Sequence, residues 1–226
     1  ADANDDPKPA ELQSIVALYG QGQLQSAFEE VQKLQIAYPQ SITLFDLCGG
    51  LAKQLGYIDF SINQYKELLK IDSQNADAYF DLASAVKLKG DFPLAFNYYE
   101  KSIKIDPLRA ETHYNIGNIL KDMGEFKEAI VSYKEAIRVK SDYAEAFNNM
   151  GMASDELGDN EAAIKGYKQA LKIKENYYLP ARNLVGAPRG SVDSEALGFV
   201  KPLIYGEHRL VLEEEVFGFF EAHYIC

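Results

Sequence analysis

The chain has 226 residues, of which 47% are hydrophobic, and carries a formal net charge of -11. This much apolar material excludes a disordered tail, and the acidic balance argues against a nucleic-acid partner because neutralising phosphates requires a basic face. No window approaches eighteen consecutive apolar residues, so we expect no membrane insertion.

The N-terminal residues 1–7, ADANDDP, are predicted to form an acidic, flexible segment. They have neither the basic start nor the apolar run of a signal peptide, although a leader could have been removed before Ala1. Cys48 and Cys226 are too few and too far apart to indicate a disulfide framework, which favours a reducing, cytoplasmic location. With no Cys/His cluster, we expect no metal and no other cofactor.

Glycines recur at one interval along most of the chain. Gly22, Gly56, Gly90, Gly124 and Gly158 are each 34 residues apart. A fixed interval of this length indicates a repeat architecture. We therefore predict an array over residues 8–185, divided into a degenerate first repeat at 8–41, full repeats at 42–75, 76–109, 110–143 and 144–177, and the first helix of a further repeat at 178–185.

Both halves of each repeat have the apolar spacing of a helix. Examples are AYFDLASAV (78–86) before a repeat glycine and AFNYYEKSIKI (95–105) after it. The glycine between them suits a tight reversal, because a residue without Cβ adopts a left-handed conformation readily. The prediction is an all-α fold of antiparallel helix pairs.

The repeats resemble the tetratricopeptide repeat (TPR). AYFDLASAVKLKGDFPLAFNYYEKSIKIDP (78–107) and THYNIGNILKDMGEFKEAIVSYKEAIRV (112–139) match its pattern through Gly117, the turn glycines, Ala95, Ala129, Ala136 and Pro107. The resemblance implies a right-handed superhelical solenoid of about five repeats. Departures are local: the first repeat lacks the aromatic and Leu-Gly positions, Gly166 interrupts one second helix, and Ser73, Ser141 and Glu175 replace proline.

Residues 186–226 are expected to form an irregular repeat with atypical C-terminal helices. GAPRGS (186–191) breaks the repeat register, and EHRLVLEEEVFGFFEAHYIC (207–226) reads as a helix with an apolar stripe. That helix could begin a further repeat of a longer protein, or fold back as the cap that a solenoid requires. Its stripe could also pair with a second copy, giving a homo-oligomer.

Helix geometry separates two faces of each first helix. At about 100° per residue, positions four, seven, eight and eleven of a repeat share an arc that should pack on the second helix. The opposite arc should line a concave groove, as the TPR resemblance implies. The predicted peptide-binding residues on it are Phe80, Asp81, Lys87, Tyr114, Asn115, Asn118, Lys121, Asn148, Asn149, Arg182 and Asn183.

The asparagines of this arc are the most specific prediction. An amide has two donors and one acceptor oxygen, so a row of asparagines can hold a peptide backbone. Asn115, Asn149 and Asn183 match a series that binds peptide backbone in the TPR superhelix of O-linked N-acetylglucosamine transferases, whereas Asp81 departs from it. The alternatives are amides that link neighbouring helices, or amides that are only solvated. We interpret Asn149 as a backbone holder and Asn148 as a selector of sequence.

The other arc positions carry weaker predictions. Phe80 and Tyr114 are expected to supply specificity, because aromatic side chains in a groove offer a large contact area. Lys87 and Lys121 are read as a solvated rim. The lysine, asparagine and arginine clamp of chaperone-binding TPRs is not matched, because Tyr114, Leu179 and Asn183 occupy its basic positions.

No catalytic constellation is found, so we predict that the chain is not an enzyme. His113 occupies a core position, and His208 and His223 are too far apart to share a helical face at ligand spacing. The predicted function is a non-catalytic scaffold that binds a protein or an extended peptide. The alternatives are a self-association module, or the substrate-recognition arm of a fused glycosyl-, sulfo- or methyltransferase, as bacterial relatives with similar repeats suggest.

Overall fold

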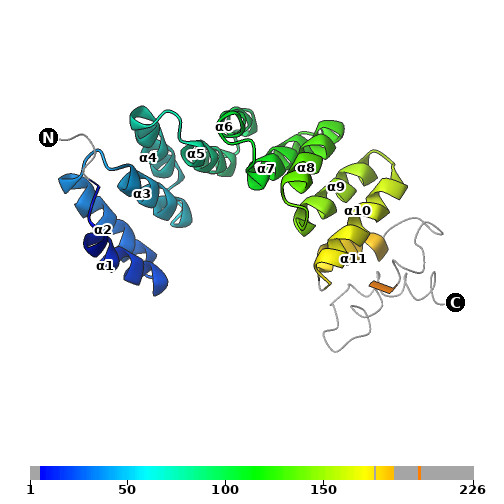
Figure 1. Cartoon of the computed structure of the whole chain (residues 1–226), viewed down its shortest axis with the longest axis horizontal. Helices are drawn as coiled ribbons and strands as arrows, with labels where there is room; N and C mark the ends of the chain where they lie inside the picture. Colours follow the sequence, from blue (N-terminus) through cyan, green and yellow to red (C-terminus); the bar gives the residue numbers. More distant parts are fainter. Residues whose placement is uncertain (1–5, 176, 186–197, 200–226) are drawn as a thin grey trace. The chain divides into compact units, whose positions relative to one another are not determined.

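The computed structural model describes residues 6–175, 177–185 and 198–199 (Figure 1). Within these residues every regular element is a helix, as the sequence predicted. The chain divides into two compact units, at residues 1–108 and 109–226. The predicted C-terminal helices at 186–226 lie outside the described residues except at 198–199, as does most of the segment 1–7.

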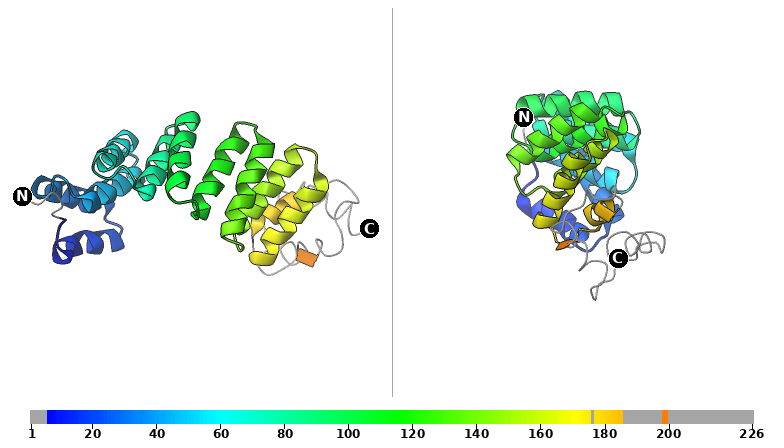
Figure 2. Two further views of the ribbon diagram at one scale, coloured as in Figure 1. Left: turned by 45° about the horizontal axis from the view of Figure 1, so that its top comes forward. Right: turned by 90° about the vertical axis from the view of Figure 1, so that its right-hand side faces the viewer.

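The first unit contains three helix pairs, drawn in blue to green in Figures 1 and 2. Consecutive helices pack against each other, both within a pair and from one pair to the next. The helices are α1 (Pro9–Gly20), α2 (Leu24–Ala37), α3 (Ile42–Gln54), α4 (Ile58–Ile71), α5 (Ala76–Leu88) and α6 (Phe92–Ile105).

The second unit contains two helix pairs followed by the first helix of another repeat. Its helices also pack consecutively, and α11 contacts both α10 and α9. They are α7 (Ala110–Asp122), α8 (Phe126–Val139), α9 (Ala144–Glu156), α10 (Asn160–Ile173) and α11 (Tyr178–Val185).

The repeat glycines reverse the chain within each pair. All five have positive φ, from 72° at Gly22 to 88° at Gly90. At Gly56, the amide N–H donates to the Lys53 carbonyl at 3.2 Å and the next amide donates to the Ala52 carbonyl at 2.8 Å, a Schellman motif. A Cβ built on any of these glycines meets nothing within 4 Å, so the backbone conformation, and not space, requires glycine.

A second set of glycines allows the two helices of a pair to approach closely. A Cβ on Gly117 would lie 2.6 Å from the Tyr133 ring, and one on Gly151 would lie 2.8 Å from the Tyr167 ring. Both rings are buried almost completely. Each of these tyrosines therefore packs over the bare backbone of the first helix.

Gly166 was expected to interrupt the second helix of its repeat, and this prediction is wrong. Helix α10 continues through it from Asn160 to Ile173. A Cβ on Gly166 would lie 2.9 Å from the Phe147 carbonyl oxygen and 3.0 Å from the Gly151 Cα. Gly166 thus meets Gly151 where α10 and α9 pack backbone to backbone.

The predicted inward arc is largely confirmed. Cys48, Leu82, Ala83, Val86 and Ile116 are among its buried members. The arc was too narrow, however, because positions three and ten of the first helices are buried as well. These are Leu44, Leu51, Ala78, Ala85, Thr112, Ile119, Ala146 and Ala153. In a stacked array each first helix packs against the neighbouring repeat as well as against the second helix of its own repeat, so a second row of its side chains is buried.

Candidate functional site

Five of the predicted groove residues of the second unit meet in one hydrogen-bonded set, which we call the amide network. It comprises Asn118, Asn148, Asn149 and Asn183 with the hydroxyls of Tyr114 and Tyr133. The Asn149 Nδ2 group donates to the Asn118 Oδ1 atom at 2.8 Å and to the Tyr114 hydroxyl at 3.1 Å. The Tyr133 hydroxyl donates to the same Asn118 oxygen at 2.8 Å. The network therefore joins α7, α8 and α9.

Asn149 bonds to neighbouring helices, which is the alternative role considered for it from the sequence. An amide has two N–H donors, and both have partners within the protein. Its Oδ1 atom accepts from Asn148 Nδ2 at 3.1 Å and keeps one lone pair. Asn149 in this arrangement can offer a peptide an acceptor, but it cannot offer a donor.

Asn148 does not lie on an open groove surface, contrary to the expectation from helix geometry. Its side chain is completely buried. Besides Asn149, its Nδ2 group contacts the Met152 Sδ atom at 3.5 Å, and its Oδ1 atom accepts from Asn183 Nδ2 at 3.4 Å. Because α11 of the next repeat supplies Asn183, Asn148 is a buried link between α9 and α11 and not a selector of sequence.

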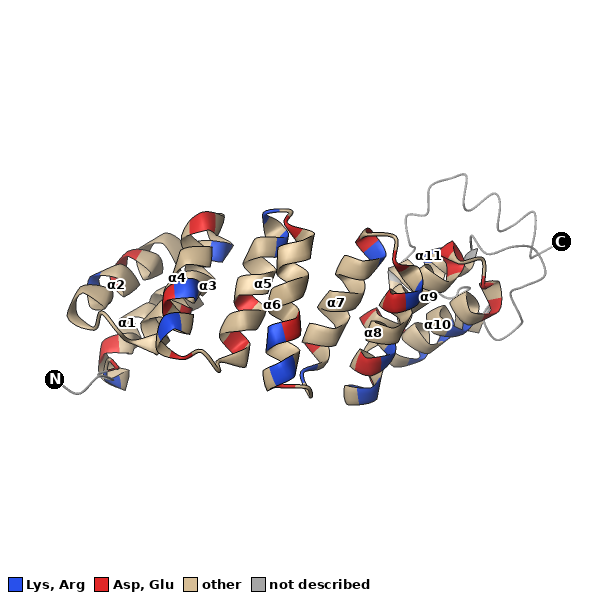
Figure 3. Ribbon diagram, turned by 90° about the horizontal axis from the view of Figure 1, so that it is seen from above, with Lys and Arg blue, Asp and Glu red and all other residues tan. Residues whose placement is uncertain are grey.

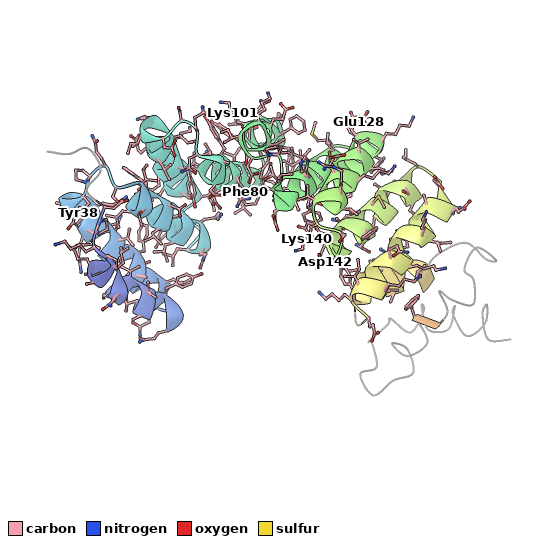
Figure 4. All side chains as sticks on the ribbon, in the orientation of Figure 1. Tyr38, Phe80, Lys101, Glu128, Lys140 and Asp142 are labelled. Carbon is pink, nitrogen blue, oxygen red and sulfur yellow. The ribbon has the colours of Figure 1, made fainter. Side chains whose placement is uncertain are left out.

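Tyr114 has two tyrosine neighbours, Tyr143 and Tyr177, that were not among the predicted site residues. Its ring lies 4.9 Å from that of Tyr143, and Lys140 lies 4.8 Å above the Tyr143 ring (Figure 4, where Lys140 is labelled). Burial and then the charge of Glu145 raise the pKa of Tyr177 to about 12, so its hydroxyl stays protonated. Tyr143 and Tyr177 directly precede α9 and α11 at the same point of successive repeats, and this spacing could have identified them.

In the first unit the predicted groove residues are partly buried, and Phe80 and Asp81 contact other side chains. The ring of Phe80, labelled in Figure 4, lies edge-on to Tyr99 at 5.6 Å. Asp81 forms an ion pair of 2.6 Å with Lys53 of α3. Lys87 is half-buried near the end of α5.

The remaining predicted residues lie in the second unit. Lys121 forms an ion pair of 3.2 Å with Asp122. Asn115 is half-buried, and Arg182 is exposed on α11. His113, assigned to a core position, is only half-buried.

Across residues 6–175 and 177–185, no group of three or more His, Cys, Asp or Glu side chains is placed to hold a metal ion. No helix in the same segments is long and apolar enough to cross a membrane.

These observations define an α-helical repeat protein built from pairs of 13- or 14-residue helices after a shorter α1. Sequence models of the tetratricopeptide repeat match residues 76–107 and 144–177, a further tetratricopeptide model matches 98–131, and a TPR repeat model matches 117–153. The chain is a tetratricopeptide-repeat protein. No curated protein sequence matches it significantly.

Solved structures share the fold at low sequence identity. A crystal structure of MamA is 23% identical with a TM-score of 0.66, covering 74% of this chain and 91% of its own. YrrB, described as a TPR protein with an unusual peptide-binding site, is 16% identical with a TM-score of 0.64, covering 78% and 91%. A thermophilic TPR protein of Thermus thermophilus, TTC0263, is 20% identical with a TM-score of 0.57, covering 73% and 90%.

Proposed function

We propose that the chain is a non-catalytic protein-interaction module that binds an extended peptide on the first-helix faces of its repeats. The observation that carries this proposal is the amide network. It holds hydroxyl and amide groups in fixed positions on half-buried side chains of α7 and α9. Groups that are already fixed lose little conformational entropy when a ligand binds.

The charge distribution of the second unit fits a peptide backbone. The charged residues of α7 and α9 lie near the helix ends, as Figure 3 shows in red and blue, and the network lies between them. A peptide backbone is neutral and carries one donor and one acceptor per residue. A neutral surface with both kinds of group is suited to it.

Two groups of the network are placed to make the contacts. The second lone pair of the Asn149 oxygen can accept a peptide N–H. The Tyr114 hydroxyl accepts from Asn149, and its own proton can be donated to a peptide carbonyl. In this proposal Tyr114 replaces Asn149 as the donor to the backbone. Asn115, Asn183 and the exposed Arg182 are further proposed contacts of the peptide.

The first unit contributes its own face, with Phe80 and Lys87 as peptide contacts. The description of YrrB as a peptide-binding TPR protein supports the general proposal without identifying the ligand. The alternative in which the repeats are the recognition arm of a fused transferase is compatible with it. Self-association through 207–226 stays a prediction, and light scattering over a concentration series tests it.

A random-peptide library tests the proposal. We expect the purified chain to enrich peptides that bind in a fluorescence anisotropy titration. Tyr114→Phe, which keeps the ring and removes the hydroxyl, should weaken the binding about fivefold, the effect of one hydrogen bond of roughly 1 kcal/mol.

The matched control is Tyr98→Phe, because Tyr98 lies on the second helix α6, stacked on Tyr79 at 6.3 Å. It should leave the affinity unchanged. A library that yields no binding peptide contradicts the proposed function, and an equal effect of the two variants contradicts the role of Tyr114.

A further inference from the structure

A cavity of about 530 Å³ lies in the first unit, between α1 and α3. Its apolar wall includes Leu12, Ile15 and Val16 of α1 and Leu47 of α3. Val16 is 68% exposed, which is unusual for a valine beside a hydrophobic core. The apolar wall therefore remains open to a ligand.

The hydroxyl of Tyr65 lines this cavity without a hydrogen-bond partner among the described residues. The side chain is only 1% exposed. Its counterparts one and two repeats later do have partners: the Tyr99 hydroxyl lies 2.9 Å from the Ser84 hydroxyl, and the Tyr133 hydroxyl donates to Asn118 at 2.8 Å.

The reason is the residue at the matching place in α3. Ser84 and Asn118 occupy position nine of their repeats, and this position in α3 is Gly50. A Cβ built on Gly50 would lie 3.7 Å from the Tyr65 oxygen, an ordinary contact distance. The missing side chain both opens the cavity and leaves a nearly buried hydroxyl that a ligand can pair.

The polar end of the cavity carries a net negative charge. Asp46, Asp81 and Lys53 line it, and Lys53 pairs with Asp81 at 2.6 Å. No ion pair of Asp46 is found within the described residues. Asp46 is an exposed residue, and partial desolvation of its carboxylate, followed by the negative charges of Asp81 and Asp77, raises its pKa, while Lys53 acts in the opposite direction. A cation beside Asp46 would relieve this repulsion.

We propose that this cavity binds an arginine side chain of the partner peptide, with its aliphatic stem against α1 and its guanidinium between Asp46 and the Tyr65 hydroxyl. The inference rests on the proposed peptide-binding function. A guanidinium has five donors in one plane, so it can bond to a carboxylate and a hydroxyl at once. Its methylene stem suits the apolar wall.

Other occupants fit less well. A purely apolar side chain would leave the nearly buried Tyr65 hydroxyl without a partner. A metal ion would lie beside the ammonium of Lys53 and would find an apolar wall where further oxygen ligands are needed. Arginine satisfies both ends of the cavity.

The test uses nine-residue random peptide libraries with a fixed central residue, either arginine or citrulline. Citrulline keeps the shape of arginine and has no charge. We expect enrichment only with arginine, and a loss of about tenfold when the arginine of a selected peptide is replaced by citrulline. Asp46→Asn should cause a similar loss and should make the citrulline replacement nearly neutral.

Gly50→Ser supplies the missing side chain at position nine, so it should weaken arginine peptides without unfolding the chain, which circular dichroism verifies. The control is Asp59→Asn on α4, which removes the carboxylate that pairs with Lys89 and should not change binding. Enrichment with arginine and citrulline alike, insensitive to both cavity variants, overturns the arginine site and leaves the proposed function standing. No enrichment in either library overturns both.

Discussion

At the residue scale, two glycines at the end of α1 have opposite requirements. Gly22 has a φ of 72°, whereas Gly20 is the last residue of the helix and has no positive φ. Neither would bring a Cβ within 4 Å of another group. Comparing substitutions at Gly20 and Gly22 therefore measures the effect of backbone conformation on stability without a contribution from side-chain packing.

We expect Gly22→Ala to destabilise the chain by about 1 kcal/mol, because an L-residue with a left-handed backbone is strained. Gly20→Ala should be neutral or stabilising by up to about 1 kcal/mol, because alanine has a higher helix propensity. Urea unfolding of both variants measures the difference. Equal effects would show that the turn adopts another conformation.

Cys48 should be chemically inert in the folded protein. Its side chain is fully buried, and burial raises the pKa of the thiol to about 12, so almost no thiolate forms near neutral pH. In a Cys226→Ser variant, Ellman's reagent should titrate no thiol in buffer and one thiol per chain in urea. Fast reaction in buffer would mean that α3 opens readily.

At the element scale, Gly166 distinguishes helix propensity from helix packing. On propensity alone, Gly166→Ala should stabilise α10 by about 1 kcal/mol. We expect instead a loss of about 1 to 3 kcal/mol, because the new Cβ would meet backbone atoms of Phe147 and Gly151, which cannot rotate away. Thermal unfolding compared with Gly20→Ala measures the sign, and a stabilised variant would contradict the close packing of α9 and α10.

The same contrast explains what the sequence could predict. The turn glycines and the helix pairs follow from a 34-residue interval and local propensity, so both are visible in one chain. The role of Gly166 could not be predicted, because the distance between α9 and α10 is set by tertiary packing and is not visible in the sequence of one helix. Asn148 was misplaced because a single-helix projection does not include contacts from the following repeat, such as the hydrogen bond from Asn183.

The open hydroxyl of Tyr65 was missed for a related reason. Tyr65, Tyr99 and Tyr133 occupy the same place in their repeats, and only the contacts with Ser84 and Asn118 reveal which position is their partner. Once that partner is known, Gly50 marks the exception. The sequence contains both Tyr65 and Gly50, but it does not show that the residue at position nine contacts the tyrosine hydroxyl of the same repeat.

At the scale of the whole molecule, the two compact units should respond separately to a local defect. In a repeat protein each element contacts chiefly its neighbours, so destabilisation spreads over a limited distance. Gly117→Val overpacks the Tyr133 ring, and Gly49→Val overpacks the Tyr65 ring in the other unit.

We expect each variant to lose about 2 kcal/mol locally, which is roughly a thirtyfold increase in hydrogen exchange. Gly117→Val should accelerate exchange in α7–α11, and Gly49→Val should accelerate it in α1–α6. Mass spectrometry of the exchanged peptides resolves the two units. Uniform acceleration along the chain in both variants would show that it unfolds as one cooperative body.

The five turn glycines have one more consequence, which concerns chirality. Their φ values, from 72° to 88°, are favourable for a residue of the opposite hand, and nothing obstructs a side chain there. A D-alanine introduced by chemical ligation would fit each turn without strain and would restrict the unfolded chain, contributing about 0.4 to 1 kcal/mol per turn. The 34-residue interval therefore also identifies the five positions at which a D-amino acid would stabilise the protein.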